Sequence, residues 1–179
     1  MQTITIKDKS FSLSISSDSI QNRIKELAKQ INADYKDKRP LFISVLNGAF
    51  LFTADLFKQL DIDCEISFLR VSSYEGGVAS TGQLRNLLWV NEDIKNRHII
   101  LLEDIVDKGD TATFILEELN KQEPADIRIA TLLLKPNALK YDIKIDYVGF
   151  EIPNDFIVGY GLDYDGLGRN LGNIYKIIE

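Results

Sequence analysis

The chain has 179 residues, 45% hydrophobic and 27% charged, as in an ordinary folded domain. Its 21 basic and 27 acidic residues argue against general nucleic-acid binding, which needs a broad cationic face. The single Cys64 excludes an intrachain disulfide, and the N-terminus does not resemble a signal peptide. No apolar run approaches the roughly 20 residues of a membrane helix. The sequence therefore predicts a cytoplasmic protein that does not bind membranes.

The first half of the chain predicts strands that alternate with helices. Residues 3–15 read as short strands, and a helix with its apolar residues on one face follows, with Ser17 or Asp18 as its cap. A β-branched and aromatic run predicts a strand over 41–46, which Asn47 and Gly48 end. A helix is expected over 49–60, an alternating strand over 62–71 and a long loop over 72–86.

The second half repeats this alternation and fixes the predicted fold class. Strands are expected over 97–102, 127–134, 147–152 and 156–162, and a helix over 111–122. Largely apolar strands between helices indicate an α/β fold with a parallel sheet covered on both faces. No repeat, low-complexity tract or convincing boundary interrupts the chain, so we expect one domain over 1–179.

Polar residues gather at the predicted ends of three strands. Asn47-Gly48, Glu103-Asp104 and Lys135 each follow a different apolar run. Ligands of parallel sheets bind at the carboxyl ends of the strands, so this convergence predicts a binding site there.

Two adjacent carboxylates, Glu103 and Asp104, end the run Ile99–Leu102. Neighbouring residues of a strand point to opposite sides, and burying both acids is costly unless hydroxyls, cations or a metal satisfy them. A ribose diol or a magnesium-bound pyrophosphate would do so. The alternative is a charged strand end in contact with solvent.

A short loop, Asp107-Lys-Gly-Asp-Thr111, follows the acids. Gly109 permits a tight backbone path, and successive amides at a helix start can cradle a phosphate. The two aspartates fit beside a phosphate if their side chains turn away, one capping the helix and one facing the reacting base. The alternative is an ordinary capped helix start.

The run Ile99–Thr111 resembles the phosphoribosyl-pyrophosphate-binding motif of the type I phosphoribosyltransferases, and nearly the whole chain resembles the hypoxanthine (guanine) branch. The resemblance implies a twisted parallel sheet flanked by helices, with a core over about 20–150 and a small hood subdomain from residues 1–16 and 151–179. It implies that Glu103 and Asp104 contact the ribose and that Asp107 is the general base. The implied 5′-phosphate loop consists of Asp107, Lys108, Gly109, Asp110 and Thr111, in which Lys108 and Asp110 depart from the common family residues.

Two further segments resemble family loops on the pyrophosphate side. Leu46, Asn47 and Gly48 resemble the pyrophosphate loop, in which the peptide bond between Leu46 and Asn47 would be cis. Ser73 and Tyr74 resemble the pair in a mobile lid that excludes water. Without the resemblance, these segments read as a strand-to-helix turn and a surface loop.

The purine side is implied by residues near the C-terminus and by Lys135. In the family this Lys donates to the 6-oxo group, and a 6-amino purine would leave it unpaired. The resemblance implies that Phe156 stacks on the purine, that the Ile157 backbone meets its edge, and that Arg169 contacts pyrophosphate. The implied ligands of Mg²⁺ are Glu103 and Asp104, and Asp163, which is counted with the purine-binding residues, would bind a second Mg²⁺ on the pyrophosphate side. By itself, Phe156 would read as a core residue and Lys135 as a solvated one.

The implied reaction is purine salvage, in which a ring nitrogen of hypoxanthine or guanine displaces pyrophosphate from phosphoribosyl pyrophosphate and gives IMP or GMP. The family further implies a homodimer or homotetramer. Three alternatives stay open: a nucleotide-binding regulator of the same fold without turnover, a xanthine-preferring enzyme, and a flavodoxin-like module. No glycine-rich dinucleotide or P-loop pattern supports the last.

Overall fold

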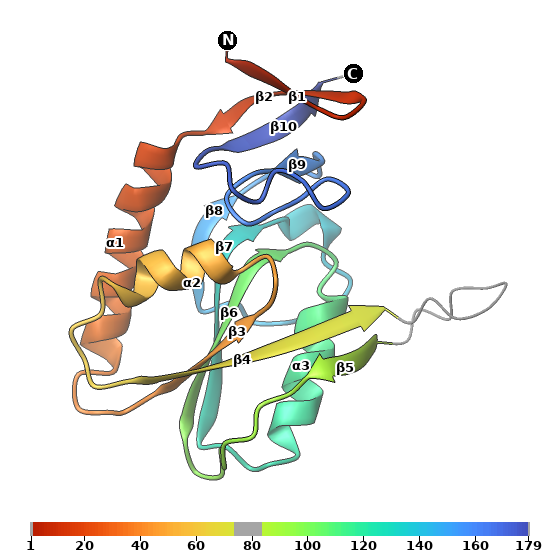
Figure 1. Ribbon diagram of the computed structural model, residues 1–179. Coiled ribbons are helices and arrows are strands. Elements are labelled where there is room, and N and C mark those ends of the chain that lie inside the picture. Colours follow the sequence, from red (N-terminus) through yellow and green to blue (C-terminus); the bar gives the residue numbers. More distant parts are fainter. Residues whose placement is uncertain (1, 74–83, 179) are drawn as a thin grey trace, which may run out of the picture.

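The computed structural model of the protein describes residues 2–73 and 84–178 and contains two sheets (Figure 1). Its helices are α1 (Ser17–Asp34), α2 (Phe50–Phe57), α3 (Asp110–Asn120) and the 3₁₀ turn η1 (Pro136–Ala138). Its strands are β1 (Thr3–Ile6), β2 (Lys9–Ile15), β3 (Leu41–Val45), β4 (Glu65–Ser73), β5 (Leu84–Leu88), β6 (His98–Val106), β7 (Asp126–Leu134), β8 (Tyr147–Glu151), β9 (Ile157–Val158) and β10 (Ile174–Ile178). None of the helices among these residues is long and apolar enough to cross a membrane.

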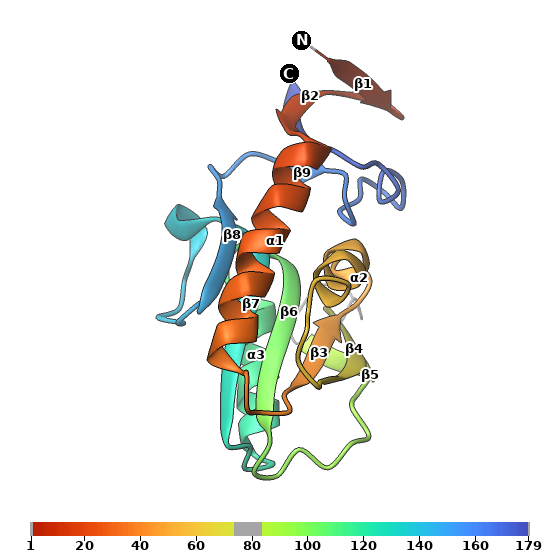
Figure 2. The same cartoon turned by 90° about the vertical axis from the view of Figure 1, so that its left-hand side faces the viewer.

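The larger sheet has the strand order β5-β4-β3-β6-β7-β8. All neighbouring strands from β4 to β8 run parallel, and only β5 pairs antiparallel, with β4. Figure 2 shows α1 on one face of this sheet and α3 on the other. The predicted α/β fold with a helix-flanked parallel sheet is therefore confirmed.

The two faces of β6 bury two separate cores. Ile100 and Leu102 pack in the cluster that includes α1 and α2, whereas Ile99 and Leu101 pack against α3. This alternation explains why the strand reads as a continuous apolar run, because both faces of a central parallel strand are covered. The same strand continues without a break through Glu103 and Asp104, which belong to β6 itself.

The smaller sheet belongs to the predicted hood and has the order β1-β2-β10-β9, with antiparallel pairs throughout. It joins the two chain ends, which lie close together at the top of Figure 1. Its own core contains Phe11, Val158 and Tyr175. The hood implied by the resemblance is thus present, and β10 is a strand that the sequence analysis did not predict.

Several predicted element bounds need correction. Ser16, not Ser17 or Asp18, caps α1, and its side chain accepts a hydrogen bond from the Ser19 amide. The predicted loop 72–86 contains the start of β5. The strand expected over 156–162 is limited to β9, because Gly159, Tyr160 and Gly161 all have positive φ angles that no regular strand accommodates.

Candidate active site

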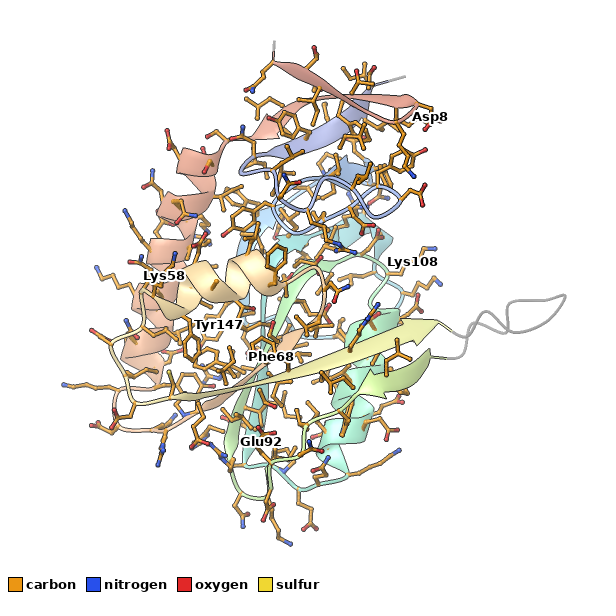
Figure 3. The ribbon with its side chains drawn as sticks, viewed as in Figure 1. Asp8, Lys58, Phe68, Glu92, Lys108 and Tyr147 are labelled. Atoms are coloured by element: carbon orange, nitrogen blue, oxygen red, sulfur yellow. The ribbon has the colours of Figure 1, made fainter. Side chains whose placement is uncertain are left out.

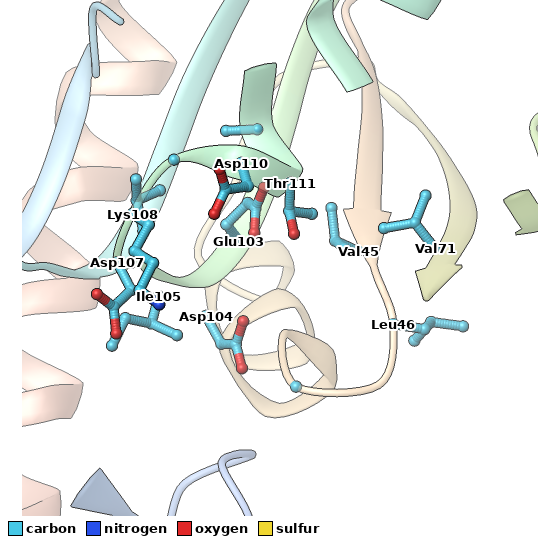
Figure 4. A pocket seen from close by; sticks show the side chains of 14 residues that line it. Val45, Leu46, Val71, Glu103, Asp104, Ile105, Asp107, Lys108, Asp110 and Thr111 are labelled. Carbon is cyan, nitrogen blue, oxygen red and sulfur yellow. The ribbon is translucent and has the colours of Figure 1, made fainter. Parts of the chain in front are cut away.

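A cavity of about 460 Å³ opens where β3 and β6 end and α3 begins. It gathers two of the three strand ends singled out in the sequence. In Figure 4, Glu103 and Thr111 lie across the pocket from Val45 and Leu46. The lining residues are Val45, Leu46, Gly48, Val71, Glu103, Asp104, Ile105, Val106, Asp107, Lys108, Gly109, Asp110, Thr111 and Ala112.

Glu103 is a buried acid without a complete set of partners. Only 4% of its surface is exposed, and its Oε1 atom has no hydrogen-bond partner among residues 2–73 and 84–178. Burial, and then the charge of Asp104, raises the pKa of this carboxyl well above its usual range. A buried acceptor left unpaired costs free energy, so this oxygen is suited to a ligand that brings a hydroxyl or a cation.

Asp104 lies against Gly48 of the neighbouring strand's end. A Cβ atom placed at residue 48 would lie 1.6 Å from the Asp104 Oδ2 atom, so only glycine leaves room for this carboxylate. Burial raises the pKa of Asp104 to about 6, although nearby amides and the Arg169 charge oppose the rise. The peptide bond between Leu46 and Asn47 is cis, as the resemblance implied.

The loop from Asp107 to Thr111 is supported from outside by the segment that follows η1. Gly109 adopts a left-handed backbone with φ of 86°, and the Lys140 amide donates to the Lys108 carbonyl over 3.0 Å. The Tyr141 hydroxyl donates to Asp110 Oδ1 over 2.9 Å, which turns this acid toward the supporting segment. The prediction that an aspartate caps the helix is wrong, because Gly109 is the N-cap and no side chain caps α3.

The predicted base and the predicted purine-reading cation are in direct contact. Lys135 Nζ lies 2.8 Å from Asp107 Oδ2, and Lys135 is only 7% exposed. A buried ammonium requires a charged partner, and Asp107 supplies it. Parallel pairing of β6 with β7 brings these two strand ends together.

The remaining predicted residues lie outside the cavity lining. Phe156 is 45% exposed and meets Tyr164 edge-to-face at a centroid distance of 5.9 Å. Ile157 is buried in the hood sheet. Arg169 pairs with Asp163 over 2.6 Å. The exposed Asn47 is likewise absent from the lining, Ser73 ends β4, and Tyr74 lies outside the described residues.

Sequence reasoning missed the apolar part of the cavity wall. Val45, Val71 and Ala112 line it together with Ile105 and Val106. Their only sequence signal was their place beside a strand end or a helix start. They give the two acids a low-dielectric wall, which is the physical cause of the raised pKa values.

The acidic oxygens fit the ligand preference of Mg²⁺. Among the residues that the structure describes, no group of three or more His, Cys, Asp or Glu side chains is arranged to hold a metal. Mg²⁺ is commonly bound by one or two carboxylates together with substrate phosphates, and it prefers hard oxygen ligands. The unpaired Glu103 oxygen and the Asp104 carboxylate meet that requirement, whereas a complete protein cage is not needed.

The sequence matches a known family over most of its length. The profile of the family described as "Phosphoribosyl transferase domain" matches residues 16–165. The hypoxanthine-guanine phosphoribosyltransferase of Bacillus subtilis is 43% identical over 157 residues, which are 88% of this chain and 87% of that protein. The enzyme of the same name from Streptococcus pneumoniae is 43% identical over 165 residues, 92% of each chain.

Solved structures agree with these sequence matches. A hypoxanthine phosphoribosyltransferase from Staphylococcus aureus superposes with a TM-score of 0.88 at 40% identity, and the match covers 93% of this chain and 91% of that one. A hypoxanthine-guanine phosphoribosyltransferase from Bacillus anthracis, with a HEPES molecule in its active site, gives 0.87 at 37% identity, covering 94% and 97%.

Proposed function

The chain belongs to the phosphoribosyltransferase family, and we propose that its site transfers the 5-phosphoribosyl group from phosphoribosyl pyrophosphate to hypoxanthine, guanine or both. The products are IMP or GMP and pyrophosphate, and the role is purine salvage. The observation that carries this proposal is the pocket lined by the buried Glu103, the half-buried Asp104 and the loop 107–111 together with Leu46 and Gly48.

The phosphoribosyl group is held by the strand end and the loop that follows it. Glu103 and Asp104 accept hydrogen bonds from the ribose hydroxyls, which satisfies the Glu103 oxygen that has no partner in the described part of the chain. The loop amides from Lys108 to Thr111 bind the 5′-phosphate at the start of α3, and Thr111 adds its hydroxyl. Asp110 accepts from the Tyr141 hydroxyl and lies 3.6 Å from Lys140 Nζ, which reduces the repulsion between its charge and the phosphate.

The purine is activated by the Asp107–Lys135 pair. Asp107 takes or shares the proton of the purine ring nitrogen as this atom attacks the sugar. Lys135 donates to the 6-oxo group, and a 6-amino purine would leave this buried cation facing another donor. Phe156 stacks on the purine face, and the Ile157 backbone meets the purine edge. Because both substrates are held in line, the activation free energy of the transfer is lowered further.

The leaving pyrophosphate is bound from the other side by the turn at Leu46, Asn47 and Gly48 and by Arg169. Mg²⁺, when bound with the pyrophosphate, offsets the charge that develops on the leaving group. Glu103 and Asp104 are the side chains proposed to hold it, and Asp163 is proposed to bind a second Mg²⁺ on the pyrophosphate side. Closure of the lid residues Ser73 and Tyr74 would exclude water from the reacting sugar.

The whole chain is proposed as one catalytic domain, with its core over about 20–150 and its hood from 1–16 and 151–179. We further propose that it works in the cytoplasm as a homodimer or homotetramer. A regulator without turnover, a xanthine-preferring enzyme and a flavodoxin-like module are not favoured, because the curated relatives are named for transfer to hypoxanthine and guanine.

Turnover with a panel of purines tests the proposal. Magnesium, phosphoribosyl pyrophosphate and each of hypoxanthine, guanine, xanthine and adenine are mixed with the protein, and nucleotide formation is followed by absorbance. We expect turnover with 6-oxopurines but not adenine, and Asp107→Asn should lower kcat about 100-fold. The exposed Asp142→Asn serves as the matched control. Tight nucleotide binding without any turnover would instead identify a regulator.

A further inference from the structure

Tyr160 occupies an unusual place between the hood and the main sheet. It is only 3% exposed, and its backbone is left-handed with φ of 48°, between two glycines that also have positive φ angles. A bulky residue rarely adopts this conformation, so the surrounding contacts must hold it there. Its amide donates to the Leu171 carbonyl over 2.8 Å, which fixes the backbone on the hood side.

The hydroxyl of Tyr160 reaches out of the hood to α2. It donates to Asp55 Oδ2 over 2.7 Å and lies 3.4 Å from the Leu51 carbonyl, one turn earlier on the same helix face. Asp55 is itself fixed by Gln21 of α1 over 2.6 Å and by Lys58 over 2.7 Å. Lys58 lies at the end of α2 on the α1 side of the molecule (Figure 3).

The next residue, Gly161, touches the turn proposed to bind pyrophosphate. A Cβ atom at residue 161 would lie 2.0 Å from the Gly48 carbonyl oxygen, so the two backbones are in direct contact. Gly161 also fixes Arg169 in two ways. Its amide donates to the Arg169 carbonyl over 2.9 Å, and its own carbonyl accepts from the Arg169 guanidinium over 2.7 Å.

We propose that Tyr160 is a positioning residue for the pyrophosphate end of the site. Its hydrogen bond to Asp55 holds Gly161 in contact with Gly48. This contact fixes the position of the proposed pyrophosphate turn, and the hydrogen bonds of Gly161 fix the position of the Arg169 guanidinium. Two groups that come from distant parts of the chain are thereby held in one geometry. The inference rests on the proposed function, since it concerns the leaving group of that reaction.

The Tyr160 hydroxyl can be removed without leaving a buried charge unpaired. Asp55 keeps Gln21 and Lys58 as donors, and the Tyr160 ring still fills its place in the core. Tyr160→Phe should therefore fold, and its main effect should be looser placement of Gly161. The purine-side residues Asp107 and Lys135 directly follow β6 and β7 and pair with each other over 2.8 Å rather than with Tyr160 or Asp55.

The test compares Michaelis constants for the two substrates. Tyr160→Phe should raise the KM for phosphoribosyl pyrophosphate, and for pyrophosphate in the reverse direction, by roughly three- to tenfold, the effect of one lost hydrogen bond near a charged ligand. The KM for hypoxanthine should change less than about twofold. A merely structural role would not separate the two substrates.

Tyr147→Phe is the matched control. This buried tyrosine also donates to an aspartate, Asp34, over 2.6 Å, but it starts β8 and lies well away from Lys108 (Figure 3). It should leave both Michaelis constants unchanged. Equal shifts in the two variants, or equal shifts for both substrates in Tyr160→Phe, would overturn the proposal.

Variants of Asp55 add an independent check. Asp55→Ala should raise the same Michaelis constants as Tyr160→Phe. Asp55→Asn should raise them less, because its amide oxygen still accepts a hydrogen bond. The double variant Asp55→Ala with Tyr160→Phe should show no larger increase than Asp55→Ala alone. If the wild type showed no turnover, the proposed function would fail. Calorimetric titration of wild type and Tyr160→Phe with magnesium pyrophosphate would still decide the present inference, because equal affinities would contradict it.

Discussion

Acidic side chains at the two ends of the main sheet, Glu103 and Asp34, have pKa values shifted in opposite directions. At the carboxyl end, Glu103 is buried with an unpaired oxygen, and its pKa is raised. At the amino end, Asp34 accepts from the Tyr147 hydroxyl over 2.6 Å and from Arg128 over 2.7 Å. The Tyr147 hydrogen bond, and then Arg128, outweigh burial and lower the pKa of Asp34.

The difference shows where the fold gives up stability. At the amino end the ionisation of the paired Asp34 stabilises the fold, whereas at the carboxyl end the ionisation of Glu103 and Asp104 opposes folding until a ligand arrives. The same strands, β6 to β8, serve both ends. The main sheet therefore holds Glu103 and Asp104 ready for a ligand at its carboxyl end. At its amino end, Asp34 already has its hydrogen-bond partners.

The largest expected effect comes from filling the space that Asp104 occupies. Gly48→Ala would place a methyl group 1.6 Å from Asp104 Oδ2, so the carboxylate would have to move. We expect kcat/KM for phosphoribosyl pyrophosphate to fall about 100-fold, as displacements near 1 Å do at reacting centres. Gly172→Ala, where the nearest atom is 3.7 Å away, is the control in steady-state kinetics. Unchanged kinetics in Gly48→Ala would contradict the placement of Asp104 in the site.

Neutralising Glu103 should separate stability from binding. Glu103→Gln removes the carboxyl whose raised pKa means that its ionisation opposes folding, so the free energy of unfolding of the ligand-free protein should rise while the KM for phosphoribosyl pyrophosphate increases. Denaturant unfolding and kinetics measure the two effects. Glu118→Gln, at a surface pair with Lys121, should change stability by less than about 0.5 kcal/mol. A less stable Glu103→Gln protein would show that the acid is paired in solution.

The smallest expected effect is a difference in pH dependence between the two ends. The folded-state pKa of Asp104, about 6, lies above its ordinary value of 3.8, so the folded protein binds more protons and its stability falls as pH rises through that window. Asp34 has a lowered pKa, so its contribution is present above its ordinary value and is lost as pH falls. We expect unfolding free energies to decrease by about 1 kcal/mol from about pH 5 to pH 7.

Two variants assign this pH dependence to its groups. Asp104→Asn should flatten the decrease above about pH 5, and Asp34→Asn should remove part of the loss below about pH 4. Denaturant titrations at several pH values provide the measurement. Identical profiles for both variants would mean that the two ends do not differ as described.

The larger sheet was predictable because its signals are local. The run Ile99–Leu102 is apolar on both faces, and this pattern needs no knowledge of distant partners. Strand β10 was missed because it depends on pairing with β2, more than 150 residues away in sequence. Strand β5 was missed because Arg85 and Asn86 interrupt its apolar residues within a polar stretch.

The acidic part of the site was also predictable, whereas its support was not. Glu103, Asp104 and the loop to Thr111 are contiguous, so the motif itself brings them together. The contact between Gly161 and Gly48 joins segments that share no local pattern. The glycines on both sides of Tyr160 were a usable signal, since they mark a backbone that cannot continue a strand.

The placement of β10 between β2 and β9 has a consequence for synthesis on the ribosome. A nascent chain that has emerged only as far as β8 already carries every residue that lines the cavity, but it lacks Arg169 and two of the four hood strands, β9 and β10. Because synthesis runs from the N-terminus, the residues that line the cavity leave the ribosome before β9, Arg169 and β10. An unfinished chain would thus carry the cavity-lining residues while lacking the cation proposed to hold the leaving group, and it would also lack Ile157, Tyr160 and Ile174 of the core that α1 and α2 share.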